Sequence, residues 1–203
     1  PLKSSERTGD MPLIIAGGHA CYNPEPMAEF IDAFVIGEGE EVVHDIINIY
    51  QTWKAGGSDR SALLQQLSQI WGVYVPSLYQ THYAADGTIS AFEALNPAVP
   101  ALIKKRIVAK LPPPPQHLLV PNIDVVHNRV SVEIMRGCTR GCRFCHAGMI
   151  NRPIRERPVA EVVSSIEKAL DNTGFEEIAL LSLSSSDYTH IHELIEALTT
   201  KFE

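Results

Sequence analysis

The spacing of apolar and polar residues predicts alternating strands and helices in the first third of the chain. A short apolar run at 12–16 ends in two glycines and is typical of a buried parallel strand, and a second run at 32–36 ends in a Gly-Glu-Gly-Glu turn. A proline-containing turn at 23–26 predicts a short helix between them. Residues 40–53 predict a longer helix with one apolar side, formed by Val42, Val43, Ile46, Ile47, Tyr50 and Trp53. This order predicts an open, doubly wound α/β sheet.

The middle of the chain predicts a helix, a hairpin and a spacer. Gly56 and Gly57 end the long helix, and Ser58 or Asp59 caps another that runs to about residue 70. Residues 73–76 and 79–92 are typical of a β-hairpin that turns at Asp86-Gly87. The proline-rich stretch 96–121, with four consecutive prolines, favours polyproline II and predicts a stiff spacer; a ligand for a proline-binding partner is the alternative.

The last third predicts two successive β-α units. Strands are expected at 130–135 and 177–183, and helices at 158–170 and about 191–198, with Gly174 ending the first helix. Such units are typical of the start of a β/α barrel, where chemistry lies at the carboxyl ends of the strands. We therefore expect residues 1–76 to form a partial α/β domain, 77–128 a hairpin and linker, and 129–203 the first part of a barrel.

Composition narrows the class of protein. The chain has 203 residues, of which 45% are hydrophobic, and no apolar run approaches the roughly 20 residues of a membrane span. No signal-peptide pattern opens the sequence, and four cysteines do not make a secreted disulfide framework, so we expect a cytoplasmic protein without a membrane segment. The chain begins without methionine and stops inside a helical pattern, so we expect a piece of a longer protein.

Charge is unevenly spread along the chain. The net charge is −7, yet residues 101–158 carry eleven Lys and Arg against three Asp and Glu. This basic segment would neutralise an anionic cofactor or attract nucleic acid, or it is simply a solvated linker. The charge pattern alone leaves these alternatives open.

Three cysteines carry the clearest chemistry. Cys138, Cys142 and Cys145 follow the predicted strand at 130–135 with the spacing C-x3-C-x2-C, and Phe144 precedes the last of them. Three thiolates in one eight-residue loop can bind three corners of a cubane iron–sulfur cluster and leave the fourth iron open. Zinc would need His146 or Cys21 as a fourth ligand, and a disulfide would leave one thiol unpaired. The cluster agrees best with the spacing.

These four residues resemble the signature of the radical S-adenosylmethionine (SAM) superfamily. The resemblance implies a 4Fe-4S cluster on Cys138, Cys142 and Cys145, with SAM chelated by the open iron. One electron, from a donor such as flavodoxin or ferredoxin, would then cleave SAM to methionine and a 5′-deoxyadenosyl radical. Phe144 would cover the adenine side.

The resemblance also assigns a role to the turn after the next strand. The family commonly has a Gly-Gly-Glu-like turn there that receives the SAM amino group, and here Ser182, Ser184 and Ser185 take its place. Alternatively, Ser186 or Asp187 merely caps the next helix. Arg140 and Arg143 would screen the cluster charge or be solvated, and His146 is expected to be a bystander.

The N-terminal part resembles the cobalamin-binding-like domain that precedes many radical SAM barrels, in an uncharacterised iron–sulfur oxidoreductase group. The cobalamin-ligating pattern D-x-H-x-x-G is absent from the sequence, so cobalamin is doubtful and we favour a scaffold role. The serine turn also looks like that of tRNA methylthiotransferases, which would make RNA a substrate, but those enzymes use three further cysteines and only Cys21 is present. A non-catalytic electron-transfer module is the other alternative. Two β-α units are only part of a barrel, so we expect this chain alone to be inactive.

Overall fold

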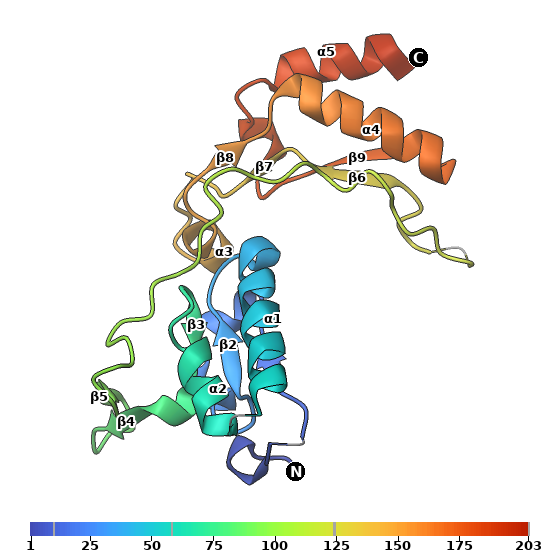
Figure 1. Ribbon diagram of the computed structural model, residues 1–203. Helices are drawn as coiled ribbons and strands as arrows, with labels where there is room; N and C mark the ends of the chain where they lie inside the picture. Colours follow the sequence, from blue (N-terminus) through green and yellow to red (C-terminus); the bar gives the residue numbers. More distant parts are fainter. Residues whose placement is uncertain (10, 58, 124, 203) are drawn as a thin grey trace. The chain divides into compact units, whose positions relative to one another are not determined.

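The computed structural model describes residues 1–9, 11–57, 59–123 and 125–202, and its contacts divide the chain into two units (Figure 1). The first unit is Pro1–Val108 and the second is Ala109–Glu203. The hairpin and the residues up to 108 therefore belong with the first unit. The division expected from the sequence, with a domain at 1–76, a hairpin and linker at 77–128 and the start of a barrel at 129–203, stays a prediction.

A three-stranded sheet organises the first unit. Strand β1 (Ile15–Ala16) pairs in parallel with β2 (Ala33–Val35), and β3 (Val73–Tyr74) pairs antiparallel with β2. Helices α1 (Gly39–Gly56) and α2 (Arg60–Leu67) pack on one face of this sheet, and β2 is visible between them in Figure 1. Their shared core contains Ala33, Val35, Val42, Ile46, Leu63, Leu67, Ile70, Val73 and Val75.

Three expectations for this sheet need correction. The run at 12–16 forms a strand of only two residues, and Ile15 is 39% exposed because it lies outside the hydrophobic clusters that pack on the two faces of the sheet. Residues 73–74 join that sheet instead of the hairpin. On α1, Val43 and Ile47 are 46% and 44% exposed, since the described elements cover only the side that carries Val42 and Ile46.

Aromatic rings fill the opposite face of the sheet. Phe34 and Tyr74 point away from the helices and pack with Tyr79, and Tyr74 also contacts Phe92. Tyr79 and Phe92 belong to the hairpin of β4 (Tyr79–Tyr83) and β5 (Ile89–Ala94), which turns at Asp86-Gly87 as predicted. Short 3-10 helices complete the unit: η1 (Ser4–Glu6), η2 (His19–Tyr22), η3 (Glu25–Met27) and η4 (Pro76–Leu78). The predicted turn of helix at 23–26 corresponds to η3.

The predicted helix ends are confirmed for the described residues. Gly57 takes the left-handed conformation (φ 65°) after α1, and the carboxylate of Asp59 accepts the Ala62 N–H at 2.8 Å to cap α2. Ser58, the alternative cap, lies outside the described residues.

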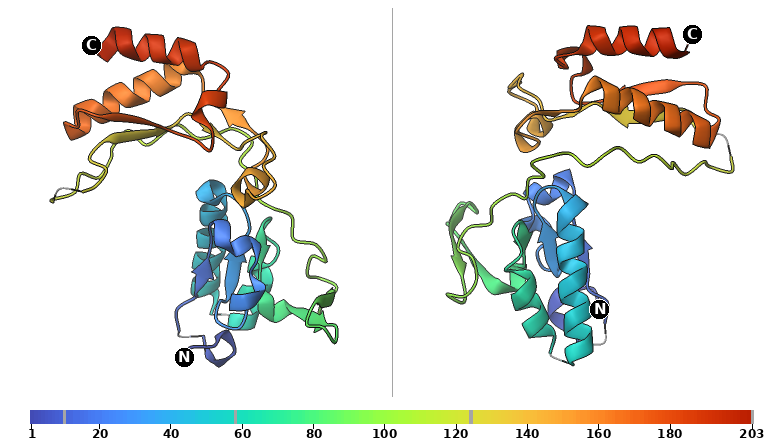
Figure 2. Two further views of the ribbon diagram at one scale, coloured as in Figure 1. Left: turned by 180° about the vertical axis from the view of Figure 1, so that it is seen from behind. Right: turned by 45° about the horizontal axis from the view of Figure 1, so that its top comes forward.

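The second unit contains the two predicted β-α units, shown from two further directions in Figure 2. Strand β6 (Val130–Glu133) pairs in parallel with β9 (Ile178–Leu181), and β7 (Met135–Arg136) pairs antiparallel with β8 (Arg155–Glu156). Helices α4 (Val159–Thr173) and α5 (Ile191–Phe202) pack over β6 and β9, and Gly174 ends α4 in the left-handed conformation. The short α3 (His146–Ile150) and η5 (Ser185–Asp187) follow the cysteines and β9. The α/β class is confirmed.

The predicted spacer is held at both ends. In the first unit the Arg106 N–H donates to the Ile36 carbonyl at 2.8 Å, and Val99 and Val108 are buried. In the second unit the Pro112 carbonyl accepts from Arg157 at 2.6 Å and the Gln116 carbonyl accepts from Asn172 at 3.1 Å. The proline-rich stretch is therefore partly a packed segment. Within the part of the chain that the structure describes, no helix is long and apolar enough to cross a membrane.

A buried ion cluster fastens the N-terminal residues to the first unit. The Asp32 carboxylate, 1% exposed, accepts from Arg7 at 2.8 Å, from Arg60 at 3.0 Å and from the Ile14 N–H at 2.8 Å. Arg60 also donates to backbone carbonyls at Met11 and Pro12. One carboxylate thus pairs with two buried guanidinium groups.

Replacing Asp32 with asparagine should destabilise the protein by about 3 kcal/mol, because it leaves two buried cations without a counter-charge. The measurement is the free energy of unfolding from urea titration. The control is Glu29→Gln, which removes an exposed pair with Lys3. A loss for Asp32→Asn no larger than the control's would contradict this role.

Candidate functional site

The loop that carries the cysteines and the turn that carries the serines leave the same edge of the second unit's parallel pair. Val130 lies opposite Ile178, and Glu133 lies opposite Leu181. The chain continues from β6 through β7 into the cysteine loop, residues 137–145, and from β9 into the serine turn, residues 182–187. The carboxyl ends of parallel strands are where α/β folds place their ligands. This edge is therefore the candidate site, as the sequence predicted.

The three cysteines of the loop are free thiols in different surroundings. Cys138 is buried, Cys142 is exposed, and Cys145 is partly buried. The Cys138 sulfur accepts the Arg140 N–H at 3.4 Å, and the Cys145 sulfur accepts the Gly148 N–H at 3.3 Å. Hydrogen bonds of this kind stabilise the negative charge of thiolate ligands and tune an iron–sulfur cluster.

The three thiols agree with a cluster in their chemistry but not in their present arrangement. Among the described residues, no group of three or more His, Cys, Asp or Glu side chains is arranged to hold a metal ion. The three thiols are thus close in sequence but do not converge on one point. Their chemistry fits a cluster nonetheless, because all three are unpaired and two already accept N–H donors.

A glycine allows the loop to turn tightly against its neighbours. Gly137 has φ 93°, and a Cβ there would lie 2.8 Å from the Pro153 carbonyl oxygen and 2.9 Å from that of Asn151. Any other residue would be strained in that conformation and would also clash. The close packing at Gly137 therefore fixes the position of the buried Cys138 that follows it.

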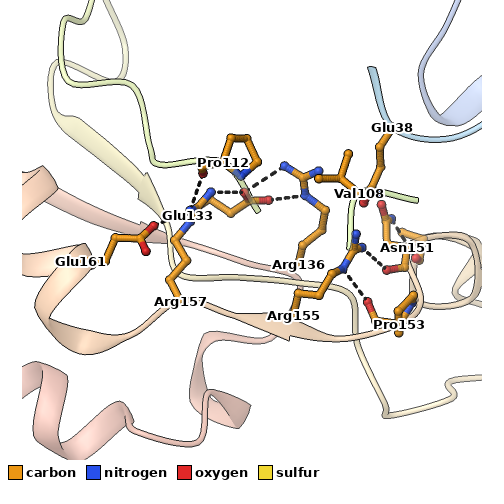
Figure 3. Close-up of polar contacts among 11 residues, drawn as sticks. Glu38, Val108, Pro112, Glu133, Arg136, Asn151, Pro153, Arg155, Arg157 and Glu161 are labelled. Atoms are coloured by element: carbon orange, nitrogen blue, oxygen red, sulfur yellow. Dashed lines mark hydrogen bonds and ion pairs between the residues drawn. The ribbon is translucent and has the colours of Figure 1, made fainter. Parts of the chain in front are cut away.

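A carboxylate lies between two arginines, one of which directly precedes the cysteine loop, and Figure 3 shows their contacts. Glu133, the last residue of β6, accepts two hydrogen bonds from Arg136, at 2.8 and 3.0 Å, and one from Arg157 at 3.3 Å. Arg157 is almost fully buried and also donates to Glu161 at 2.7 Å and to the Pro112 carbonyl. Sequence reasoning missed this group, because its members are distributed over 49 residues and only the fold brings them together.

The two arginines set the ionisation of Glu133. Partial burial by itself raises the pKa of this carboxyl, but hydrogen bonds and charge from Arg136, and then from Arg157, outweigh burial and hold the pKa below its ordinary value. The ionised carboxylate is therefore the form that the folded state prefers.

The serine turn is closed by its own hydroxyls. Ser182 and Ser185 share a hydrogen bond of 2.8 Å, the Ser184 N–H donates to the Ser182 hydroxyl at 3.2 Å, and the Ser185 hydroxyl reaches the Leu180 carbonyl at 3.4 Å. The Ser184 hydroxyl donates to Asp187 at 2.7 Å. All three predicted serines therefore lie in one network at the end of β9.

Asp187 does not cap the next helix, and neither does Ser186. Helix α5 begins at Ile191, so both residues lie too early in the chain for that position. The Asp187 carboxylate instead pairs with Arg140 of the cysteine loop, and hydrogen bonds from Arg140 and Ser184 lower the Asp187 pKa to about 2. The prediction of a simple helix cap was wrong because the competing partner lies 47 residues away.

The remaining predicted residues lie at the surface. Phe144 is 91% exposed and Arg143 is exposed beside it, while His146 opens α3. Placement of Phe144 over an adenine ring stays a prediction.

The comparisons with known proteins cover both units. A family model described as "Radical SAM proteins, N-terminal" matches residues 1–76, and one described as "Radical SAM superfamily" matches residues 132–202. The chain is 27% identical over 132 residues to the ribosomal protein uS12 methylthiotransferase RimO of Paramagnetospirillum magneticum, which covers 65% of this chain and 26% of that protein. It is 25% identical over 202 residues to the uncharacterized protein MJ0966 of Methanocaldococcus jannaschii, covering 97% of this chain and 37% of that protein.

The chain thus spans about a quarter to two fifths of the length of these relatives. No solved structure matches it.

The ionisation of Glu133 gives a pH prediction. Because its folded-state pKa is lowered, its stabilising contribution is present above the unfolded pKa, about 4.3, and disappears as the pH falls through that value towards the folded-state pKa. Glu133→Gln removes the titrating group. Urea unfolding of both proteins should therefore show a stability difference at neutral pH that shrinks below about pH 4. A difference that stays constant with pH would contradict the assigned charge.

Proposed function

Because this chain belongs to the radical SAM superfamily, we propose that it binds a 4Fe-4S cluster through Cys138, Cys142 and Cys145 and takes part in the reductive cleavage of SAM. The observation that carries the proposal is the set of three free thiols in one loop, inside the segment that the superfamily model matches. The loop leaves the ligand-binding edge of the parallel pair, which supports the same conclusion.

In this proposal the cysteines bind the cluster and two backbone N–H groups tune it. The three thiolates hold the iron, and the Arg140 and Gly148 N–H groups withdraw charge from two of the sulfurs. When bound, the cluster supplies the electron that breaks the S–C5′ bond of SAM and gives methionine and a 5′-deoxyadenosyl radical.

The serine turn would receive the amino acid end of SAM. Ser182, Ser184 and Ser185 present hydroxyls beside the cysteine loop, and a hydroxyl that donates one hydrogen bond keeps lone pairs to accept another from an ammonium group. The exposed ring of Phe144 is available to cover the adenine. The electron would come from a reducing protein partner of the flavodoxin or ferredoxin type, in the cytoplasm.

Sulfur insertion is the second candidate function. The relative from P. magneticum is a methylthiotransferase by name, and its similarity extends over 132 residues of this chain. Cys21 is the one cysteine outside the loop, so the second cluster of such enzymes has no ligand set here. We therefore place general SAM cleavage first and methylthio transfer to an RNA or protein substrate second.

Replacing any one of Cys138, Cys142 or Cys145 with alanine should abolish the cluster, because each supplies one of only three protein ligands. The measurement is iron and sulfide content, with electron paramagnetic resonance (EPR) of the reduced protein, after anaerobic reconstitution of the full-length protein. Cys21→Ala is the matched control and should keep the cluster, since Cys21 is buried in the first unit. Clusters that survive in the loop variants would refute the ligand assignment.

The reconstituted full-length protein should release 5′-deoxyadenosine from SAM when a strong reductant is added. Chromatography of the quenched mixture detects the product. A protein with an intact cluster that yields none would instead be an electron-transfer module. Detection of a methylthio group on added RNA or ribosomal protein would favour the second candidate.

A further inference from the structure

An ion pair connects the cysteine loop to the serine turn. Arg140 lies between Cys138 and Cys142, and its Nε donates to Asp187 Oδ2 at 2.6 Å while its Nη2 pairs with Oδ1. Both ends of the guanidinium fork are thus used on one carboxylate. This bidentate geometry fixes the direction of approach as well as the distance.

Both ends of the pair are tied to the backbone of the site. On one side, Asp187 also accepts from Ser184, and the serine network continues to the Leu180 carbonyl in β9. On the other side, the Arg140 N–H donates to the Cys138 sulfur. Hydrogen bonds therefore run from the end of β9 to the first cysteine, with the ion pair in the middle.

Stability of the fold does not account for the pair. The Arg140 side chain is 62% exposed, and exposed ion pairs contribute little to folding. The pair instead joins two segments that no strand pairing connects directly, since the cysteine loop begins beyond the last paired residue of β7 and the serine turn beyond that of β9. We therefore expect the ion pair to set the distance between the cysteine loop and the serine turn.

We propose that Arg140 and Asp187 are positioning residues, which hold the cysteine loop at a fixed distance from the serine turn and so assemble the binding site for the amino acid end of SAM. The inference rests on the proposed function of this edge. In this proposal the Arg140–Asp187 pair raises the affinity for SAM, whereas the cysteines alone bind the iron.

The test compares variants of the anaerobically reconstituted full-length protein. Asp187→Asn keeps the size of the side chain and removes its charge, Arg140→Gln removes the other charge, and the exchange Arg140→Asp with Asp187→Arg restores a pair in reverse. The matched control is Glu167→Gln, which breaks the exposed pair with Lys201 between α4 and α5. Iron and sulfide content report the cluster, and the change of the EPR spectrum on titration with SAM reports SAM affinity.

Each single variant should keep the cluster content of the control and bind SAM about three- to tenfold more weakly, the effect of one exposed but bidentate pair. The exchanged pair should recover part of that affinity. Equal SAM affinity in the single variants and the control would overturn the positioning role while the proposed function stands. Loss of the cluster in Asp187→Asn would also overturn it, because the pair would then serve ligation. A wild-type protein without a cluster would refute the proposed function first, and this inference with it.

Discussion

Parallel pairing of β6 with β9 is the constraint on which the candidate site depends. The pairing places Glu133 opposite Leu181, so the segments that follow them begin at one edge although 48 residues separate the two positions. The core beneath α4 and α5 holds the register, with Val130, Ile134, Ile166 and Leu194 fully buried. If the register slipped, the inward and outward faces of the strand would exchange. The parallel direction of the two strands is what keeps the cysteines and the serines at one edge.

Ion pairs add further contacts between the segments that the sheets bring together. Glu133 pairs with Arg136 and Arg157 just before the cysteine loop begins, and Asp187 pairs with Arg140 within that loop. In the first unit, Arg106 pairs with Glu41 and Asp45. The role of the basic segment 101–158 could not be decided from the sequence. In the structure, carboxylates within each unit partly neutralise its charge. This favours a structural role for these arginines over a surface that binds nucleic acid.

Local signals in the sequence predicted most of the elements. Glycines at 57 and 174 and the Asp59 cap mark helix ends by short-range chemistry, and the structure confirms them. The cysteine motif and the serine turn were also visible, because both are contiguous.

What the sequence did not predict depends on distant partners. The exposure of Ile15 depends on which distant segments pack against β1, and the antiparallel pairing of residues 73–74 with β2 is not encoded in their own pattern. Asp187 resembles a helix cap locally, but a guanidinium 47 residues earlier determines its role. Likewise, the proline-rich stretch predicts a stiff spacer between domains, and its pattern gives no sign that Arg157 and Asn172 donate to its carbonyls.

In the proposed function, one edge of the second unit brings SAM to an open iron of a cluster held by three cysteines. The most direct measurement is electron–nuclear double resonance on the reduced, reconstituted full-length protein with SAM labelled isotopically in its amino and carboxylate groups. The account predicts hyperfine coupling between the cluster and the labelled nitrogen and oxygen atoms. A cluster that forms but shows no coupling to either label would contradict it.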